Sequence, residues 1–380
     1  MQLIKGFNSK LPSILRSFWG RHKKKIYGTL GILGSGYLLY KLYDYQKRRL
    51  FELERELAAE RENDERIKAQ MQEHFATIQR IADTTTLPHA MNFLSRRINE
   101  ELNLSVLTES LKQGKNTLTL QEKLELWDRL KVLSFTKMVL SLWAVTMLNL
   151  FVRVQVNILG RHLYIDIARG LESSPLHEEG TLIDHDDEQK FLSIADFLAT
   201  HSLPALINNM HTAAAESLKS KQLKDAFTFS TLHETVMQIL DTFMSMGRPR
   251  QWIEYVMPEC PKLPSLTPSS SSNDLIPADL SKFEQLKTET QAVISSDEFR
   301  NVVEVSLRTM ADALVKEVVD QSGVGTPCLG TPLVKLVPRV VQMSQLLLDE
   351  PSRNQFLQMI GNIHEVDLFF TILYANTSTV

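Results

Sequence analysis

The chain has 380 residues but only two cysteines, Cys260 and Cys328. Two cysteines are too few for a disulfide framework or for a metal site made of cysteines. This scarcity excludes a small disulfide-bonded scaffold and favours a reducing compartment for the bulk of the chain. The Asn-x-Ser triplets that begin at Asn103 and Asn376 are therefore predicted to be chance matches to the glycosylation motif.

The short motifs of common enzymes are missing as well. The sequence contains no HExxH, no GxSxG and no glycine-rich loop ending in Lys-Ser/Thr. The adjacent pair His185 and Asp186 leaves one alternative open, a metal-dependent phosphohydrolase on an all-α fold with His162 as a further ligand. Because this pair lies in an acidic loop, we favour a non-enzymatic protein with no catalytic residue, metal or cofactor.

Acidic residues are absent from the first 43 residues, although the formal net charge of the whole chain is −3. The overall charge argues against a nucleic-acid partner. Helically spaced apolar residues among basic ones in the first twenty positions suit a membrane-surface helix or a mitochondrial presequence. A basic cluster follows, which we predict to be the targeting signal: Arg21, His22, Lys23, Lys24 and Lys25.

An uncharged run from Ile26 to Tyr40 follows the basic cluster. If the charged end of the Lys41 side chain reaches back to water, the apolar segment extends from Ile26 to Tyr43. As a helix it is then about 27 Å long, which is enough for one tilted membrane pass. A cleaved signal peptide and a short buried helix are the alternatives. Basic residues flank both ends, so the positive-inside rule gives no orientation. We assign residues 1–25 to targeting and residues 26–45 to a membrane anchor.

Residues 46–82 are rich in charges of both signs and carry a narrow apolar stripe at helical spacing. The stripe consists of Leu50, Leu53, Leu57, Ile67 and Met71. This pattern predicts a helical stalk that leads from the anchor into the body of the protein.

The longest helical pattern runs from Gln121 to Asp166 and contains no proline. As one helix, its part up to Leu159 would be about 58 Å long. No charge occurs from Met138 to Val152, and a helix that is apolar all round must be buried in protein or in lipid. These residues span only about 22 Å, short of a hydrocarbon core of about 30 Å, so burial in protein is favoured.

The rest of the chain alternates between helical patterns and polar or proline-rich segments. Helices are predicted over about residues 87–112, 189–202, 204–220, 224–246, 279–294, 296–321, 333–348 and 351–374. Loops are predicted near residues 170–188, 248–278 and 322–332. The predicted fold is therefore all-α: a large helical bundle around one long central helix, over residues 46–380, preceded by a single N-terminal membrane anchor.

Trp127 is the candidate binding residue. It shares a helix face with apolar and basic residues, Lys123 and Leu130 among them. A tryptophan set among lysines favours a partly exposed binding groove, with Lys123 and Lys131 steering an acidic partner. The competing interpretation is that Trp127 caps the core.

Three segments resemble the peroxin-3 family in that family's order. They are LRSFWGRHKKK before the anchor, KLELWDRLKVLSFT in the long helix and RVQVNILGRHLYID near its end. The resemblance is to a plant-like member and covers mainly residues 15–170, while residues 1–14 have no counterpart in the family pattern.

This resemblance implies a receptor in the peroxisomal membrane with one anchor and its bulk in the cytosol. The implied partners are membrane lipids and the N-terminal amphipathic helix of peroxin-19, the chaperone that delivers peroxisomal membrane proteins as cargo. Carried over residue by residue, the groove for that helix would contain Lys123, Trp127, Leu130, Asn157, Leu163, Leu107 and Leu111. The residues alone leave a mitochondrial outer-membrane tether or structural protein as the alternative function.

Overall fold

The computed structural model describes residues 11–113, 118–172, 184–258, 281–320, 330–351 and 354–375. Side chains are described over the same ranges except for residues 11–40, 42, 64, 166–172, 319 and 320. Both cysteines, the Asn376 triplet, the side chains of the targeting cluster and most side chains of the predicted anchor lie outside this part. The chain divides into two units, Met1–Glu73 and His74–Val380.

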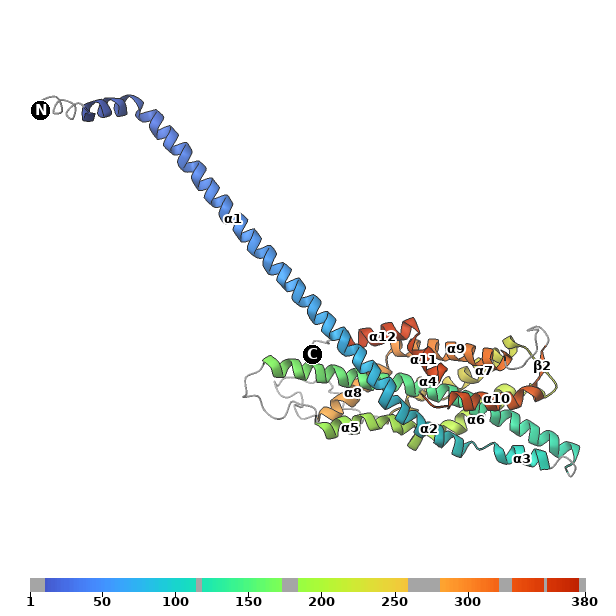
Figure 1. Cartoon of the computed structure of the whole chain (residues 1–380). Helices are drawn as coiled ribbons and strands as arrows, with labels where there is room; N and C mark the ends of the chain where they lie inside the picture. Colours follow the sequence, from blue (N-terminus) through green and yellow to red (C-terminus); the bar gives the residue numbers. More distant parts are fainter. Residues whose placement is uncertain are drawn as a thin grey trace, which may run out of the picture. The chain divides into compact units, whose positions relative to one another are not determined.

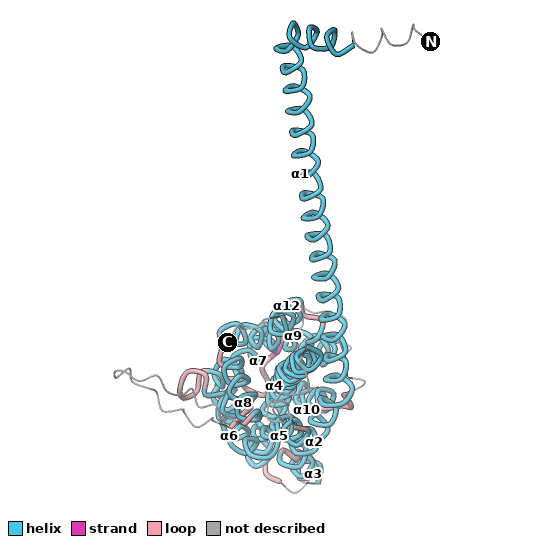
Figure 2. The backbone as a smooth tube through the Cα atoms, turned by 90° about the vertical axis from the view of Figure 1, so that its left-hand side faces the viewer, coloured by secondary structure: helices cyan, strands magenta, loops and turns pink. Residues whose placement is uncertain are grey.

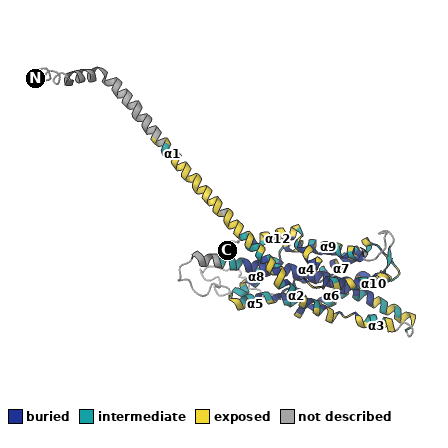
Figure 3. Cartoon of the chain, in the orientation of Figure 1, coloured by how far each residue is buried: buried dark blue, intermediate teal, exposed yellow. Residues whose placement is uncertain are grey.

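The first unit consists, where it is described, of one helix. This is α1 (Leu11–Ile81), whose last turns belong to the second unit (Figure 1). Its backbone is helical from the predicted surface segment through the predicted anchor and stalk, because its one proline, Pro12, stands at the helix start, where a missing N–H costs little. No side chain described between Lys41 and Glu73 is buried (Figure 3).

The second unit is helical, which confirms the predicted fold class. After the end of α1 its elements are η1 (Ala82–Thr86), α2 (Leu87–Glu101), α3 (Ser105–Gln113), α4 (Leu120–Glu172), α5 (His185–Ser193), η2 (Ile194–Asp196), η3 (Leu198–Ser202), α6 (Leu203–Leu218), β1 (Ala226–Phe227), α7 (Phe229–Met244), η4 (Gln251–Tyr255), α8 (Lys282–Ile294), α9 (Asp297–Asp320), β2 (Thr331–Pro332), α10 (Leu333–Leu347), α11 (Gln355–Gly361) and α12 (His364–Ala375). The described strands, β1 and β2, have two residues each and pair antiparallel.

Helix α4 is the centre of this unit. It contacts α2, α3 and every helix from α5 to α12, and Figure 2 shows it surrounded by them. No residue from Met138 to Val152 is more than 2% exposed. By length and composition α4 could cross a membrane, but the apolar window that meets this criterion is completely buried in protein. The prediction of a core helix, rather than a lipid-exposed one, is confirmed.

Most of the few polar side chains in the middle of α4 are hydrogen-bonded within the helix or to its neighbours. The hydroxyls of Ser141 and Thr146 donate to carbonyls one turn earlier, at 2.7 and 2.8 Å. The buried ammonium of Lys137 donates to the carbonyl of Leu102 at the end of α2, at 3.1 Å, and burial lowers its pKa. Trp143, fully buried, meets the ring of Phe243 edge-on. These contacts pair most polar groups of an almost entirely enclosed helix, whereas Asn149 Nδ2 and Gln155 Oε1 have no hydrogen-bond partner among the described residues.

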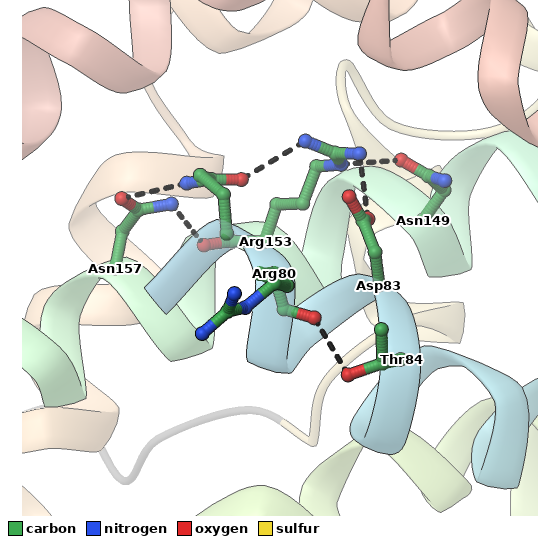
Figure 4. Close-up of polar contacts among 7 residues, drawn as sticks. Arg80, Asp83, Thr84, Asn149, Arg153 and Asn157 are labelled. Carbon is green, nitrogen blue, oxygen red and sulfur yellow. Dashed lines mark hydrogen bonds and ion pairs between the residues drawn. The ribbon is translucent and has the colours of Figure 1, made fainter. Parts of the chain in front are cut away.

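Arg153 joins α4 to the end of α1 and to η1. Its side chain is 11% exposed, and its three nitrogens donate to Asn149 Oδ1 at 3.0 Å, Gln79 Oε1 at 2.9 Å and Asp83 Oδ1 at 2.7 Å (Figure 4). Asn157 extends the network by accepting from Gln79 Nε2 at 3.0 Å. The guanidinium therefore connects an apolar helix to the entering chain by charge-assisted hydrogen bonds.

Gly160 lets the end of α1 approach α4 closely. A Cβ at this position would lie 2.7 Å from Cδ1 and 2.8 Å from Cγ1 of Ile78, which is itself buried. Gly160→Ala should therefore destabilise the fold by about 1–2 kcal/mol, because overpacking outweighs the gain in helix propensity. Chemical unfolding followed by circular dichroism measures this loss. In an Ile78→Ala background the same change should be nearly neutral, whereas an equal loss in both backgrounds would contradict the contact.

Several predicted boundaries need correction. The single helix expected over residues 351–374 is wrong, because α11 ends at Gly361 and α12 begins at His364. The long helix extends to Glu172, beyond the predicted end. Parts of the predicted loops form short elements, since α5 begins at His185 and η4 lies within 248–278. Of these loops, residues 173–183, 259–278 and 322–329 lie outside the described part of the chain.

Candidate partner-binding groove

A small apolar cluster lies near the N-terminal end of α4, beside the main core, and Leu133 packs against both. Its three buried members are Leu104, which precedes α3, Leu130 on α4 and Val337 on α10. Against them pack the half-buried side chains of Leu107, Leu111, Trp127, Leu133 and Val341. We call these eight residues the terminal cluster. It brings together Trp127, Leu130, Leu107 and Leu111, four of the seven predicted groove residues.

Local hydrogen bonds fix where α3 and α4 begin. Asn103 Oδ1 accepts from the backbone N–H of Ser105 at 3.0 Å, which starts α3. Thr119 and Glu122 form a reciprocal cap on α4: Glu122 N donates to Thr119 Oγ1 at 3.3 Å, and Glu122 Oε2 accepts from Thr119 N at 2.8 Å. These bonds to the carboxylate lower the pKa of Glu122. Both caps define the helix ends that carry the terminal cluster.

The cluster is closed on one side and open on the other. Leu130 and Val337 are at most 5% exposed, whereas Trp127 is only half-buried. Beyond Trp127 the same face of α4 carries Leu124 and Leu120, which are 46% and 77% exposed. In Figure 3 this end of α4, beside α3, is coloured as exposed and intermediate, unlike the buried middle of the helix. The terminal cluster thus has a buried floor and continues into an exposed apolar strip.

The two lysines predicted to steer a partner differ. Lys123 is half-buried, in the turn of α4 before Trp127. Lys131 is 5% exposed; its ammonium donates to the carbonyl of Lys221 at 2.8 Å and pairs with Asp128 at 3.0 Å. The steering role predicted for Lys131 is therefore wrong, because its charge is used inside the fold to hold α4 to the segment after α6.

Asn157 and Leu163 do not belong to the terminal cluster, so grouping them with Trp127 is wrong. Both lie on α4, but 30 and 36 residues further along, which corresponds to about 45 and 54 Å in one helix. Asn157 is 1% exposed and donates to the Arg153 carbonyl at 2.6 Å. Leu163 is half-buried against the main core. A single docked helix at Trp127 would not reach them.

Sequence reasoning missed four contributors to this site, one of which, Leu133, lies on α4 itself. Val337 and Val341 come from α10, about two hundred residues after Trp127 in the chain, and Leu104 comes from the turn before α3. The four-residue spacing of the two valines marks an apolar face on α10. That spacing does not say which helix the face contacts, so no local signal connected it with Trp127.

His185 and Asp186 lie in the first turn of α5. The His185 side chain is 90% exposed and lies 3.4 Å from Glu188, while Asp186 pairs with Lys190 at 2.6 Å. His162, on α4, pairs with Glu289 at 2.8 Å. Among the residues that the structure describes, no group of three or more His, Cys, Asp or Glu side chains is arranged to hold a metal ion. The geometry offers no support for the phosphohydrolase alternative.

Comparison with known proteins gives consistent matches along the chain. A sequence model of the Peroxin-3 family matches residues 114–376. The chain is 57% identical over 363 residues to Peroxisome biogenesis protein 3-2 of Arabidopsis thaliana, covering 95% of this chain and 98% of that protein. It is 28% identical over 396 residues to human Peroxisomal biogenesis factor 3, with coverages of 96% and 98%. The human match extends well beyond residue 170, where the three resembling segments end.

Proposed function

The chain belongs to the peroxin-3 family of peroxisomal biogenesis factors, and we propose that this member is the membrane docking receptor for the cargo-carrying chaperone peroxin-19. The relatives' names describe peroxisome biogenesis, and none of them describes an enzymatic activity. The observation that carries the proposal is the half-buried Trp127 at the open side of a small apolar cluster beside the main core.

The terminal cluster has the properties of a groove for an amphipathic helix. Such a helix presents apolar side chains at i, i+3, i+4 and i+7 and needs a complementary apolar strip about two turns long. Leu107 and Leu111 on α3 and Trp127 on α4 provide half-buried contacts, and Leu120 and Leu124 extend them into solvent. Two helices of the receptor would thus contact one incoming helix, with Trp127 as its anchor.

Lys123 has a different role in this proposal. It lies four residues before Trp127, one turn earlier on α4, and is half-buried. A cation there attracts an acidic helix during encounter more than it holds the bound complex. We therefore assign specificity and association rate to Lys123, and residence time to the apolar contacts.

The proposed topology joins this groove to the membrane. Residues 26–45 would span the peroxisomal membrane once, with residues 46–380 in the cytosol, where the chaperone arrives with its cargo. Holding the chaperone at the membrane surface raises the local concentration of cargo beside the bilayer and so promotes insertion. The basic cluster from Arg21 to Lys25 would direct the anchor to this membrane.

A peptide of the peroxin-19 N-terminal helix, titrated calorimetrically into the full chain in detergent, tests the docking proposal. We expect a saturable one-to-one interaction with a negative heat-capacity change, because apolar surface is buried. A scrambled peptide of the same composition has no continuous apolar face and should not bind. Equal binding of both peptides would show general attraction to apolar helices and would contradict a specific receptor.

A fluorescent fusion of residues 1–50 tests localisation and anchoring. We expect peroxisomal puncta, and retention in the pellet after alkaline carbonate extraction, because an apolar span of about 27 Å resists extraction. Replacing Arg21, Lys23, Lys24 and Lys25 by glutamine keeps the span but should lose peroxisomal targeting. Mitochondrial tubules would support the tether alternative, and recovery in the supernatant would contradict the anchor.

A further inference from the structure

The stalk segment of α1 has an apolar stripe with no cover among the described residues of its own unit. Leu50, Leu53, Leu57 and Ile67 are 63%, 49%, 52% and 42% exposed, and Tyr43 is 65% exposed. In proteins, most of the stability of a helix comes from packing its apolar face against other elements rather than from helix propensity. An exposed apolar stripe along it therefore indicates a partner that the single chain does not supply.

The stripe follows a heptad repeat. With Leu50 and Leu57 at a positions, Leu53 falls at a d position. Ile67 falls at the d position two heptads later, and Met71 falls at the a position that follows Ile67. Apolar residues at a and d make the narrow seam of a two-stranded coiled coil, rather than the wider face of a helix packed on a globular core. Phe51 and Tyr45, which are 70% and 62% exposed, lie outside this seam at b and c positions.

The charges beside the seam specify the orientation of the partner. Arg49 and Glu56 occupy g positions, and Glu54 and Arg61 occupy the e positions five residues later. In a parallel, in-register pair of identical helices, each g residue faces the e′ residue of the next heptad. Arg49 then meets Glu54, and Glu56 meets Arg61, so both pairs have opposite charges. All four side chains are exposed and available for this pairing.

We propose that the stalk of this protein, residues 43–73 of α1, pairs with the same segment of a second copy as a parallel, in-register two-stranded coiled coil. The parallel orientation is the one that two copies anchored in one membrane adopt, a point that rests on the proposed anchor. The heptad seam and the charge pairs do not depend on it. The bundles that carry the terminal clusters would then be held as a pair.

Polar residues at three core positions weaken the seam, and the first of them is Gln46 at a d position. Glu60 and Asp64 stand at the d and a positions between Leu57 and Ile67, so two copies place like carboxylates opposite each other. Polar residues at core positions cost stability and help to define register. The pair is therefore weak and dissociates on dilution, while confinement to a membrane raises the effective concentration of the second copy. The variant with Glu60→Leu and Asp64→Leu should dimerise more tightly, by roughly a hundredfold.

Disulfide crosslinking of the full chain in detergent and in liposomes tests this pairing. The background carries Cys260→Ser and Cys328→Ser. Leu53→Cys places a thiol in the seam, where two copies bring it within disulfide distance. Arg55→Cys, the matched control, lies at the outward f position of the same turn. We expect mild oxidation to crosslink the Leu53→Cys protein about tenfold faster than the control.

Charge reversal distinguishes this register from random encounter. Arg49→Glu should lower seam crosslinking by roughly tenfold, because two attractive pairs become repulsive. Adding Glu54→Arg reverses both partners and should restore it. Equal crosslinking at positions 53 and 55, or no rescue by the second reversal, would overturn the coiled coil. Peptide binding by the terminal cluster is measured on the same variants, and its retention separates this result from failure of the docking proposal.

Discussion

Trp127→Ala is expected to weaken binding of the peroxin-19 helix by roughly 30-fold to 1000-fold while leaving the fold intact. Tryptophan anchors at interface centres commonly cost 2–4 kcal/mol when truncated, which gives that range of affinity. Calorimetric titration measures the dissociation constant, and a thermal melt of the same preparation measures stability. We expect the loss mainly in the dissociation rate, because the indole contacts the bound helix rather than guiding its approach.

The thermal melt separates an anchor from a core residue. Trp127 is half-buried in a cluster with few buried members, so its truncation should lower the free energy of unfolding by only about 1 kcal/mol. Trp143 is fully buried in the middle of α4 and serves as the contrast. Trp143→Ala should cost about 3–5 kcal/mol through the cavity that it leaves. If Trp127→Ala behaves like Trp143→Ala, Trp127 caps the core and the groove proposal fails.

Lys123→Ala provides a graded control on the same helix face. The residue lies at the edge of the proposed groove, so its loss should lower affinity less than the tryptophan change does. The effect should appear in the association rate and should shrink as salt rises, because screening weakens long-range attraction. Leu368→Ala, at a 49% exposed position on α12, should change neither binding nor the melt.

The sequence was sufficient to predict the central helix for a simple physical reason. A run without charge or proline from Met138 to Val152 can be stable only if it is enclosed, and its length is too short for lipid. The structure encloses it completely. The grouping of Leu107 and Leu111 with Trp127 was implied by the family resemblance, and the structure brings these three residues together.

The remaining parts of the site depend on contacts that no local pattern encodes. The floor residue Val337 comes from α10, and its apolar face could have packed on any of several helices. Asn157 and Leu163 were misplaced because a family groove was carried over without allowing for the rise of one straight helix. Lys131 was misplaced because its buried carbonyl partner lies ninety residues away in the chain. Burial and long-range pairing are properties of the fold, so they became visible only in the structure.

Arg153→Met should lower the free energy of unfolding by about 2–4 kcal/mol, because it removes three hydrogen bonds of a largely buried guanidinium and leaves the buried oxygen of Asn149 without a donor. Asn149 Oδ1, Gln79 Oε1 and Asp83 Oδ1 would each lose a donor (Figure 4). Chemical unfolding monitored by circular dichroism measures the change. Arg300→Met is the matched control, since Arg300 pairs with Glu304 at a surface where both side chains are more than half exposed. That control should cost no more than about 1 kcal/mol.

Asp83→Asn tests whether this stability comes from the charge attraction between Arg153 and Asp83 or from the hydrogen bonds that the Arg153 guanidinium donates. Burial raises the pKa of the Asp83 carboxyl, and Arg153 only partly offsets the rise. A carboxyl whose pKa is raised on folding contributes stability below its unfolded pKa and loses that contribution as pH rises through the folded value. At neutral pH the ionisation of Asp83 therefore gives no net stabilisation. Because an asparagine still accepts a hydrogen bond from Arg153, Asp83→Asn should lower the free energy of unfolding far less than Arg153→Met. Equal losses for the two variants at pH 7 would show that the ion pair itself, rather than the satisfied guanidinium, holds the end of α1 to α4.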